Sequence, residues 1–269
     1  MKKLMAILAA VLACHASYAA ELYGTVDAFS GSSYVRDVAG RSVAVSLGMK
    51  IYEGQTIQSG ADGEVHIVTE DGGIIAVRPN TVFRIDEYKA DGDDGEDRVF
   101  MSLLEGAIRS ISGWIGKHNS SAYRVKTPNS TIGIRGTDHE VTVIENGGGE
   151  EPGTYAVVYE GATVVSTSQG ETEVIPGKYA FTSKRRAGAP IFLERKPRFM
   201  EKRRLRVEGR IQKRKEYLYG RLKNMRENRI RKVHEMRGKG KNVSPRAIRE
   251  RGGDKRKQNQ RGGQRHPAD

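Results

Sequence analysis

The stretch VKTPNSTIGIRGTDHEV, residues 125–141, reads as two short strands around a tight turn at Gly136, and it places arginine, aspartate, histidine and glutamate within six residues. Side chains alternate between the two faces of a strand. Alternation therefore puts His139 on one face and Asp138 and Glu140 on the other. A general acid–base pair must lie on one side, within hydrogen-bond reach. The pattern predicts a structural turn with a packed histidine, and argues against a catalytic or metal centre.

The surrounding sequence, from about Leu22 to Thr182, consists of short apolar runs rich in β-branched residues and separated by glycine-containing turns. This spacing predicts an all-β domain of many short strands, built as a rolled, solenoid-like sheet or as a sandwich. An apolar-x-x-glycine pattern recurs at Gly54, Gly106 and Gly161, at intervals of 52 and 55 residues. Each recurrence fits one turn of a rolled sheet, although an ordinary sandwich can carry the same pattern.

The opening stretch also resembles the signature of the FecR domain. The residues that match its central motif are Thr127, Pro128, Arg135, Gly136, Thr137 and Val141. The segments GMKIYEGQTIQSGADGEVHIVTEDGGIIAVRPNTVFRI, LLEGAIRSI and VVYEGATVVS resemble its other elements, so the resemblance covers about residues 22–182. It implies a non-catalytic sensor or scaffold domain of the bacterial envelope. His139 stands where the family usually has an aromatic residue.

The first residues, MKKLMAILAAVLACHASYAA, have the features of a secretory signal. Two lysines precede an apolar run of about ten residues, and small residues follow at the spacing that signal peptidase prefers. We expect cleavage after Ala19 and an exported protein, periplasmic or extracellular. The alternative is a lipoprotein acylated at Cys14, the single cysteine. FecR-family signal relays carry a cytoplasmic segment and a membrane helix here, so this chain looks more like the stand-alone exported members.

The charge of the chain is divided sharply. Residues 21–183 carry 13 Lys/Arg and 24 Asp/Glu, whereas residues 184–269 carry 31 and 9, a net of +22. We interpret residues 20–183 as the β domain, 184–198 as a linker, 199–237 as a basic amphipathic helix, and 238–269 as a disordered basic tail. Opposite charges in two segments imply two physical roles.

The basic region is a candidate for binding anionic lipid, lipopolysaccharide or another polyanion, because each cation near an anionic surface contributes about 1 kcal/mol. The candidate contacts are Lys202, Arg203, Arg204, Arg206, Lys213, Arg214, Lys215, Arg229, Arg231 and Lys232. Two RGG triplets hint weakly at nucleic acid, which an exported protein is not expected to meet. The basic region could also fold onto the acidic domain, or simply be a solvated helix.

Other motifs favour structural interpretations. The acidic loop at residues 91–98 fails the calcium-loop template at Gly95 and Ser102. The histidines are scattered singly, without zinc spacing, and the glycine triplet at residues 147–149 precedes two glutamates that would repel phosphate. We therefore expect no cofactor or metal. The aromatic residues Tyr52, Trp114 and Tyr159 fit core packing better than exposed recognition.

These observations predict a non-enzymatic, exported FecR-like β domain. It would bind an envelope protein that the sequence does not identify, and its cationic C-terminal arm would tether it to an anionic surface. The rival hypothesis is a polyanion- or nucleic-acid-binding protein in which the basic tail is the active part and the β domain a carrier.

Overall fold

The structure is a computed structural model that describes residues 20–90, 97–118, 120–146 and 149–202, together with Ile211 and Glu216. The predicted signal segment, most of the acidic loop, and most of the predicted helix and tail lie outside these residues. The described strands are β1 (Leu22–Ser30), β2 (Ser33–Arg36), β3 (Ser42–Ala44), β4 (Lys50–Tyr52), β5 (Thr56–Ser59), β6 (Glu64–Thr69), β7 (Ile74–Val77), β8 (Val82–Lys89), β9 (Arg98–Ile111), β10 (Tyr123–Lys126), β11 (Thr131–Ile144), β12 (Gly153–Thr167), β13 (Gly170–Val174), β14 (Tyr179–Ser183) and β15 (Ile191–Phe192). The described helical elements are α2 (Trp114–His118), η1 (Ser120–Ala122) and α3 (Arg198–Lys202).

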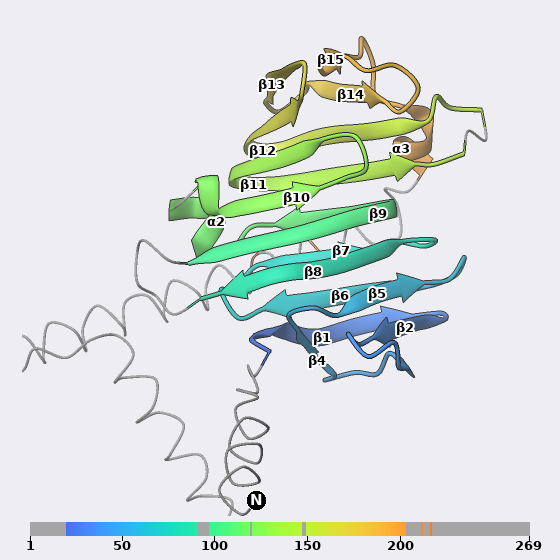
Figure 1. Cartoon of the computed structure of the whole chain (residues 1–269), viewed down its shortest axis with the longest axis vertical. Coiled ribbons are helices and arrows are strands. Elements are labelled where there is room, and N and C mark those ends of the chain that lie inside the picture. The colour runs from blue at the N-terminus through green and yellow to red at the C-terminus, as the bar shows by residue number, and fades with distance from the viewer. Residues whose placement is uncertain are drawn as a thin grey trace, which may run out of the picture.

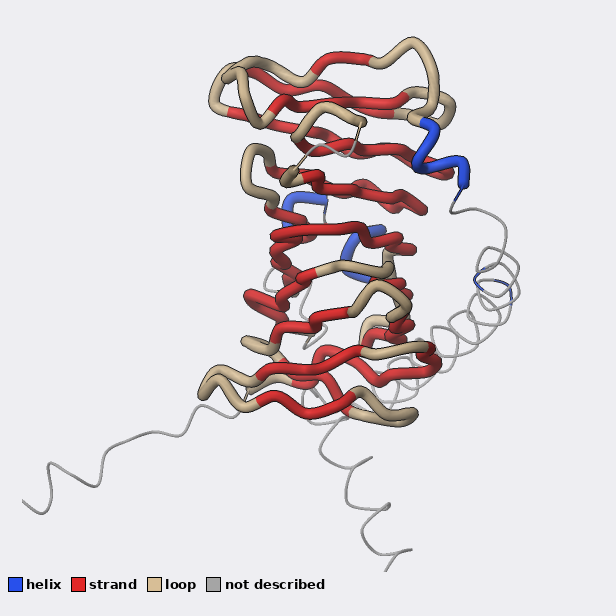
Figure 2. The backbone as a smooth tube through the Cα atoms, turned by 90° about the vertical axis from the view of Figure 1, so that its right-hand side faces the viewer, coloured by secondary structure: helices blue, strands red, loops and turns tan. Residues whose placement is uncertain are grey.

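The strands form one continuous mixed sheet that folds over into two facing layers, as Figures 1 and 2 show. Layer A has the order β3-β2-β5-β8-β9-β10-β11-β12-β13 and uses the first halves of β9 and β11 and the second half of β12. Layer B has the order β4-β1-β6-β7-β9-β11-β12-β14-β15 and uses the remaining halves of those strands. Only the β9–β10 pair among these is parallel. The predicted all-β class is confirmed.

Glycines form the corners at which the long strands pass from one layer to the other. Gly106 in β9 and Gly161 in β12 have φ of 84° and 79°, a left-handed conformation that side chains with a Cβ adopt at a cost. A Cβ on Gly106 would lie 2.3 Å from the Asn80 carbonyl oxygen. Gly54, between β4 and β5, has φ of 80°. The recurring apolar-x-x-glycine pattern therefore marks places where the chain changes layer.

The local prediction for residues 125–141 is wrong in one respect. We expected two strands around a tight turn near Gly136, but residues 131–144 are one continuous strand, β11, that bends at Gly136. The tight turn lies earlier, at Thr127–Ser130, where it joins β10 to β11. A single left-handed glycine bends a strand without ending its pairing, and β12 bends beside β11 at Gly161.

The inner faces of the two layers share one apolar core. Its largest fully buried side chains include Tyr23, Phe83 and Ile108, and Tyr23 packs edge-on against Tyr88 with ring centroids 5.1 Å apart. Both halves of each bent strand contribute to it, and the inward positions shift by one residue at the corner, as from Ile132 and Ile134 before Gly136 to Val141 and Val143 after it. The 184–198 stretch, predicted as a linker, contains β15, which pairs with β14.

No described helix is long and apolar enough to span a membrane.

Candidate functional site: the outer face of layer B

Burial changes character where the bent strands enter layer B. In β9, the residues before Gly106 include partly buried ones and the exposed Leu104 and Glu105, whereas every residue from Ala107 to Ile111 is buried. β11 shows the same change after Gly136, and β12 shows it in reverse, because it starts in layer B. A strand that is buried continuously is covered on both faces. The outer side of layer B is therefore covered, whereas the outer side of layer A faces solvent.

The outward side chains of layer B include a buried ion pair with two parallel hydrogen bonds. Arg109 on β9 donates from Nε and Nη2 to the two carboxylate oxygens of Asp138 on β11, both at 2.9 Å. Both side chains are only 3% exposed. The guanidinium also lies 4.5 Å from the ring centroid of Tyr159 on β12, with the ring below the cation. Three neighbouring strands are thus connected on this face by one arginine.

A second arginine extends the charged row along the sheet. Arg78, just after β7, lies 3.3 Å from Glu64 on β6 and 3.7 Å from Glu140 on β11. His66 Nε2 lies 2.8 Å from the same Glu64 oxygen. The Tyr159 hydroxyl donates to Glu140 at 3.4 Å and accepts from Lys196 at 3.4 Å. We call the following residues the charged row: Glu64, His66, Arg78, Arg109, Asp138, Glu140, Tyr159 and Lys196.

Two apolar clusters lie on the same face, with the row members Arg109, Asp138 and Glu140 between them. The β7 cluster consists of Ile74, Ala76, Ile111 and the isolated described residue Ile211, which is 1% exposed. The β12 cluster consists of Tyr155, Val157, Phe181 and Met200, which is 2% exposed and belongs to α3. Phe199 of α3 packs edge-on against Tyr155, with centroids 5.2 Å apart. Figure 1 shows α3 behind the strands, on the side of layer B.

The residues matched to the FecR signature occupy the turn and the corner of β11. Thr127 fixes the turn: its amide donates to the Ser130 carbonyl at 2.8 Å, and the Ser130 amide donates back to Thr127 Oγ1 at 3.0 Å. Thr154 Oγ1 on β12 also donates to Thr127 Oγ1, at 2.9 Å. Pro128 is exposed in the turn. Thr127 therefore anchors the β10–β11 hairpin to the neighbouring strand.

At the corner, Gly136 has φ of 60°, and its neighbours differ in their environment. Arg135 is exposed, with Glu173 at 4.0 Å. Thr137 is buried, and its amide donates to Ser112 Oγ at 2.9 Å. Val141 is fully buried in the core between the layers. The signature residues thus serve a turn, a corner and the core.

His139 lies on the inner face, opposite in direction to Asp138 and Glu140, as alternation predicted. It is 1% exposed, and Nδ1 lies 2.9 Å from Thr137 Oγ1. Burial lowers the pKa of His139 to about 4; the nearby Asp138 charge opposes this shift and the Arg109 charge adds to it. The imidazole is therefore neutral over the physiological range. It cannot share a substrate with the two carboxylates on the outer face.

A buried carboxyl group, that of Asp71, lies in the turn between β6 and β7, beside α2. Asp71 accepts from Thr69 Oγ1 at 2.5 Å, and the Ile115 amide in α2 donates to it at 3.4 Å. Burial raises the pKa of Asp71 above its ordinary value, although these hydrogen bonds oppose the shift. A Cβ on Gly113 would lie 2.5 Å from Asp71, so the loop packs closely around the carboxyl. The arrangement fastens α2 to the β6–β7 turn.

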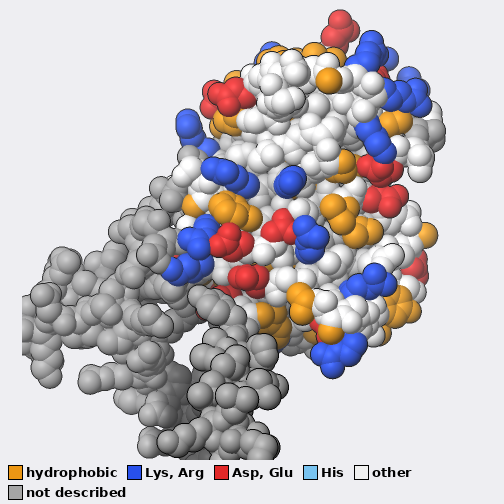
Figure 3. Space-filling model, in the orientation of Figure 1, with side chains coloured by type: hydrophobic (Ala, Val, Ile, Leu, Met, Phe, Trp, Pro, Cys, Tyr) orange, Lys and Arg blue, Asp and Glu red, His pale blue; other side chains and the backbone are white. Residues whose placement is uncertain are grey.

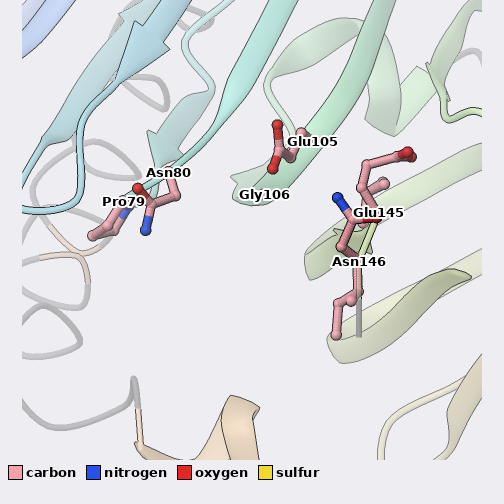
Figure 4. Close-up of a pocket in the computed structure, with 8 residues that line it drawn as sticks. Pro79, Asn80, Glu105, Gly106, Glu145 and Asn146 are labelled. Carbon is pink, nitrogen blue, oxygen red and sulfur yellow. The ribbon is translucent and has the colours of Figure 1, made fainter. Parts of the chain in front are cut away.

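A concave site of about 400 Å³ opens where the β7–β8 turn approaches the end of β11. Figure 4 shows Pro79 and Asn80 on one side of the opening, with Glu145 and Asn146 on the other and Glu105 above. Glu145 also pairs with Lys184. The site offers carboxylate and amide oxygens, but among the described residues no group of three or more His, Cys, Asp and Glu could hold a metal ion.

The outer face of layer A differs from this arrangement. Figure 3 shows it covered by basic and acidic side chains beside isolated hydrophobic ones. Its ion pairs are partly exposed, as between Arg84 and Asp86 at 2.5 Å. Of the three aromatic residues singled out from the sequence, Tyr52 and Trp114 are partly buried, and Trp114 packs against the core. Tyr159 belongs to the charged row.

Of the predicted polyanion contacts, Lys202 alone is among the described residues. Lys202 ends α3, and Arg203, Arg204, Arg206, Lys213, Arg214, Lys215, Arg229, Arg231 and Lys232 lie outside the described residues. The predicted cleavage site, Cys14 and most of the acidic loop also lie outside them. These expectations remain predictions.

A comparison with protein-family models agrees with the resemblance. The family model described as FecR protein matches residues 55–164, from just before β5 into β12, so this part of the chain is similar to FecR proteins. No curated protein matches the chain. Two crystal structures of a candidate anti-sigma factor from Parabacteroides distasonis are 14% identical, with a TM-score of 0.40, over 51% of this chain and 58% of theirs. A cell surface anchoring domain is 26% identical, with a TM-score of 0.23, over 23% of this chain and 82% of its own.

The charged row was missed from the sequence. Asp138 and Glu140 were recognised as sharing a face, but their partners Arg109 and Arg78 come from strands 29 and 62 positions earlier. The available signal was an arginine inside the apolar run AIRSI at residues 107–111, because arginine is seldom placed among buried residues unless it is paired.

Proposed function

We propose that this protein is a non-enzymatic, exported FecR-type domain that binds an envelope protein through its β domain and is held near an anionic surface by its cationic C-terminal arm. The FecR-family match supports a signalling or sensing role at the envelope. The signal segment supports export, and the net charge of +22 over residues 184–269 supports the tether. No catalytic step is part of the proposal.

The observation that carries the proposal is that the polar residues of the 125–141 stretch make structural contacts within the β domain. Asp138 is held by two hydrogen bonds from Arg109, and His139 is turned into the core. Thr127 and Thr137 hold a turn and a corner. These groups stabilise a rigid β scaffold, and such a scaffold supports recognition by its faces and edges.

The two proposed roles, recognition by the β domain and surface attachment by the arm, can be separated by neutralising the charges of the arm. In one variant of the mature chain, Arg229, Arg231, Lys232 and the later cations become glutamine, while residues up to 216 are kept because Ile211 packs on the β domain. We expect this variant to lose binding to phosphatidylcholine vesicles that contain phosphatidylglycerol. The unchanged chain should bind them, and raising salt from about 50 to 200 mM should weaken that binding by orders of magnitude.

Capture from an envelope extract at high salt then tests recognition by the β domain. The mature chain and the neutralised variant should retain the same envelope protein. A matched control replaces Arg84 and Arg124 on layer A by glutamine, which lowers the charge without touching the arm. If capture requires the arm and disappears with salt, the basic tail is the binding module and the proposal is overturned. Preferential retention of nucleic acid would overturn it in the same direction.

A further inference from the structure

We propose that the outer face of layer B is a binding surface for a basic amphipathic helix, and that the chain's own segment 198–216 occupies this surface in cis. The inference rests on the fold and stands whether or not the arm binds an anionic surface. It gives the β domain a specific recognition face, namely two apolar clusters with the buried charges of Arg109, Asp138 and Glu140 between them.

Two described residues of this segment are already seated on the face. Met200 is 2% exposed in the β12 cluster, and Ile211 is 1% exposed in the β7 cluster. Both have helical backbone, as does Glu216. Glu216 is exposed, which places it on the opposite side of the segment from the two buried residues. An apolar side chain buried at each end gives the segment two anchors.

The spacing of the anchors fits the sheet. The β12 cluster spans β14 and β12 and the β7 cluster spans β9 and β7, so their centres are about three strand spacings apart, or about 14 Å. Eleven residues of α-helix advance about 16 Å, and eleven steps of about 100° return to within about 20° of the starting face. Met200 and Ile211 therefore share one face of the helix predicted over residues 199–237. Glu216 lies about 140° from Ile211 around that helix.

The order of apolar and charged residues along the segment also matches the order of apolar and charged zones across layer B. Between the anchors, the same face of the predicted helix carries Arg203, Arg204, Val207 and Glu208, which are mainly charged. Between the two apolar clusters, layer B presents the row members on β9 and β11, namely Arg109, Asp138 and Glu140. The Oε1 atom of Glu140 is buried there without a hydrogen-bond partner, so this row keeps an unused acceptor. A buried acceptor of this kind favours a ligand that brings donors. Apolar, charged and apolar zones therefore follow in the same order on both partners.

The proposal predicts the kind of molecule that can compete. A helix with apolar residues eleven positions apart and basic residues between them would displace the segment, whereas an extended acidic peptide would not. Because the two anchors are apolar, high salt alone should not release the segment. The cations beyond Glu216 stay available for the proposed tether.

Disulfide trapping tests the docking directly. In a chain that starts at Ala20, which has no other cysteine, Ala76→Cys is combined with Ile211→Cys. We expect rapid formation of an intramolecular disulfide under mild oxidation, visible as a faster-migrating monomer on a non-reducing gel. The control combines Ile211→Cys with Leu104→Cys, which is 42% exposed on layer A, and should not cross-link. Equal cross-linking in both pairs, or none in the first, overturns the proposal. Cross-linked dimers would show that the segment docks onto a second copy.

A second measurement needs no cysteine. Ile211→Asp places a charge in an apolar cluster and should raise the rate of trypsin cleavage at the basic residues 202–215 by at least about tenfold. Glu216→Gln should leave the rate unchanged. An added peptide of residues 196–218 should bind the Ile211→Asp chain and not the unchanged chain, whose face is occupied. If Ile211→Asp is cleaved at the unchanged rate while the β domain keeps its thermal transition, the segment is not docked.

Discussion

The two outer faces of this protein share three long strands, β9, β11 and β12, yet they differ in how far they are exposed to solvent. On layer A, each of these strands includes exposed residues, and the Arg84–Asp86 ion pair is partly exposed. On layer B, the same strands are buried continuously, and Arg109 and Asp138 are each about 3% exposed. The difference shows that a change of layer at one glycine converts a solvent face into a covered one. Layer B is therefore the face on which binding is to be sought.

The largest expected effect comes from breaking the buried ion pair. Asp138→Ala leaves Arg109 buried without its bidentate partner, and it should lower the free energy of unfolding by about 3–5 kcal/mol. The comparison change on layer A is Arg84→Ala, which removes a half-exposed side chain while Asp86 keeps its hydrogen bond from Ser102, and it should cost less than about 1 kcal/mol. Urea denaturation of both variants measures the difference. Equal losses would mean that the two faces are equivalent.

The next effect concerns the corners that separate the faces. Gly106→Ala combines a left-handed φ of 84° with a contact of 2.3 Å to the Asn80 carbonyl oxygen, and should cost about 2–4 kcal/mol. Gly177 has almost the same φ, 83°, with no atom within 4 Å of an added Cβ. Gly177→Ala should therefore cost about 1 kcal/mol. Urea denaturation of the two variants measures the stability cost of close packing at the corner as the difference between their losses. Equal losses would mean that close packing does not explain the glycine at position 106.

These corners also show how much of the fold can be predicted from the sequence. Short β-branched runs predict an all-β fold, and the spacing of Gly54, Gly106 and Gly161 indicates where it rolls, because both signals are local. Alternation correctly assigned His139 and Asp138 to opposite faces for the same reason. The sequence did not predict that β11 is one bent strand. A glycine between two apolar runs has the same sequence pattern whether it forms a turn between two strands or a bend within one. The charged row was missed because its members meet only through the pairing of distant strands.

The pH dependence of stability sharpens the distinction between the two sides of layer B. His139 faces the core, and its pKa falls from 6.5 to about 4 on folding, chiefly because of burial. Between those values the unfolded chain binds the extra proton, so stability is lost as pH falls from about 6.5 toward 4, by up to roughly 3 kcal/mol from this residue. His139→Phe, which keeps an aromatic ring and removes the titratable group, should remove that part of the slope.

Comparison of the two proteins at each pH isolates this contribution. Asp71 works in the opposite sense, because its raised pKa favours the folded state at low pH, but it is present in both chains and cancels in the difference. Denaturation at pH 8 measures the packing effect of the ring exchange alone. If the difference in stability between the two proteins stays constant from pH 8 to pH 4, His139 is protonated equally in the folded and unfolded states, and its burial has no linkage to stability.

The smallest expected effect separates the two ways in which Tyr159 can hold the charged row together. Its hydroxyl contacts to Glu140 and Lys196 are both long, 3.4 Å, so Tyr159→Phe should cost less than about 1 kcal/mol. Its ring lies 4.5 Å from the Arg109 guanidinium carbon, and Tyr159→Leu, which removes the ring face, should cost about 1–2 kcal/mol more than Tyr159→Phe. Thermal denaturation of both variants ranks the two contributions. A larger loss in Tyr159→Phe would mean that the hydroxyl, by linking Glu140 to Lys196, sets the order of this face, and the covered surface would then depend on hydrogen bonds across strands more than on the stacking of arginine on an aromatic ring.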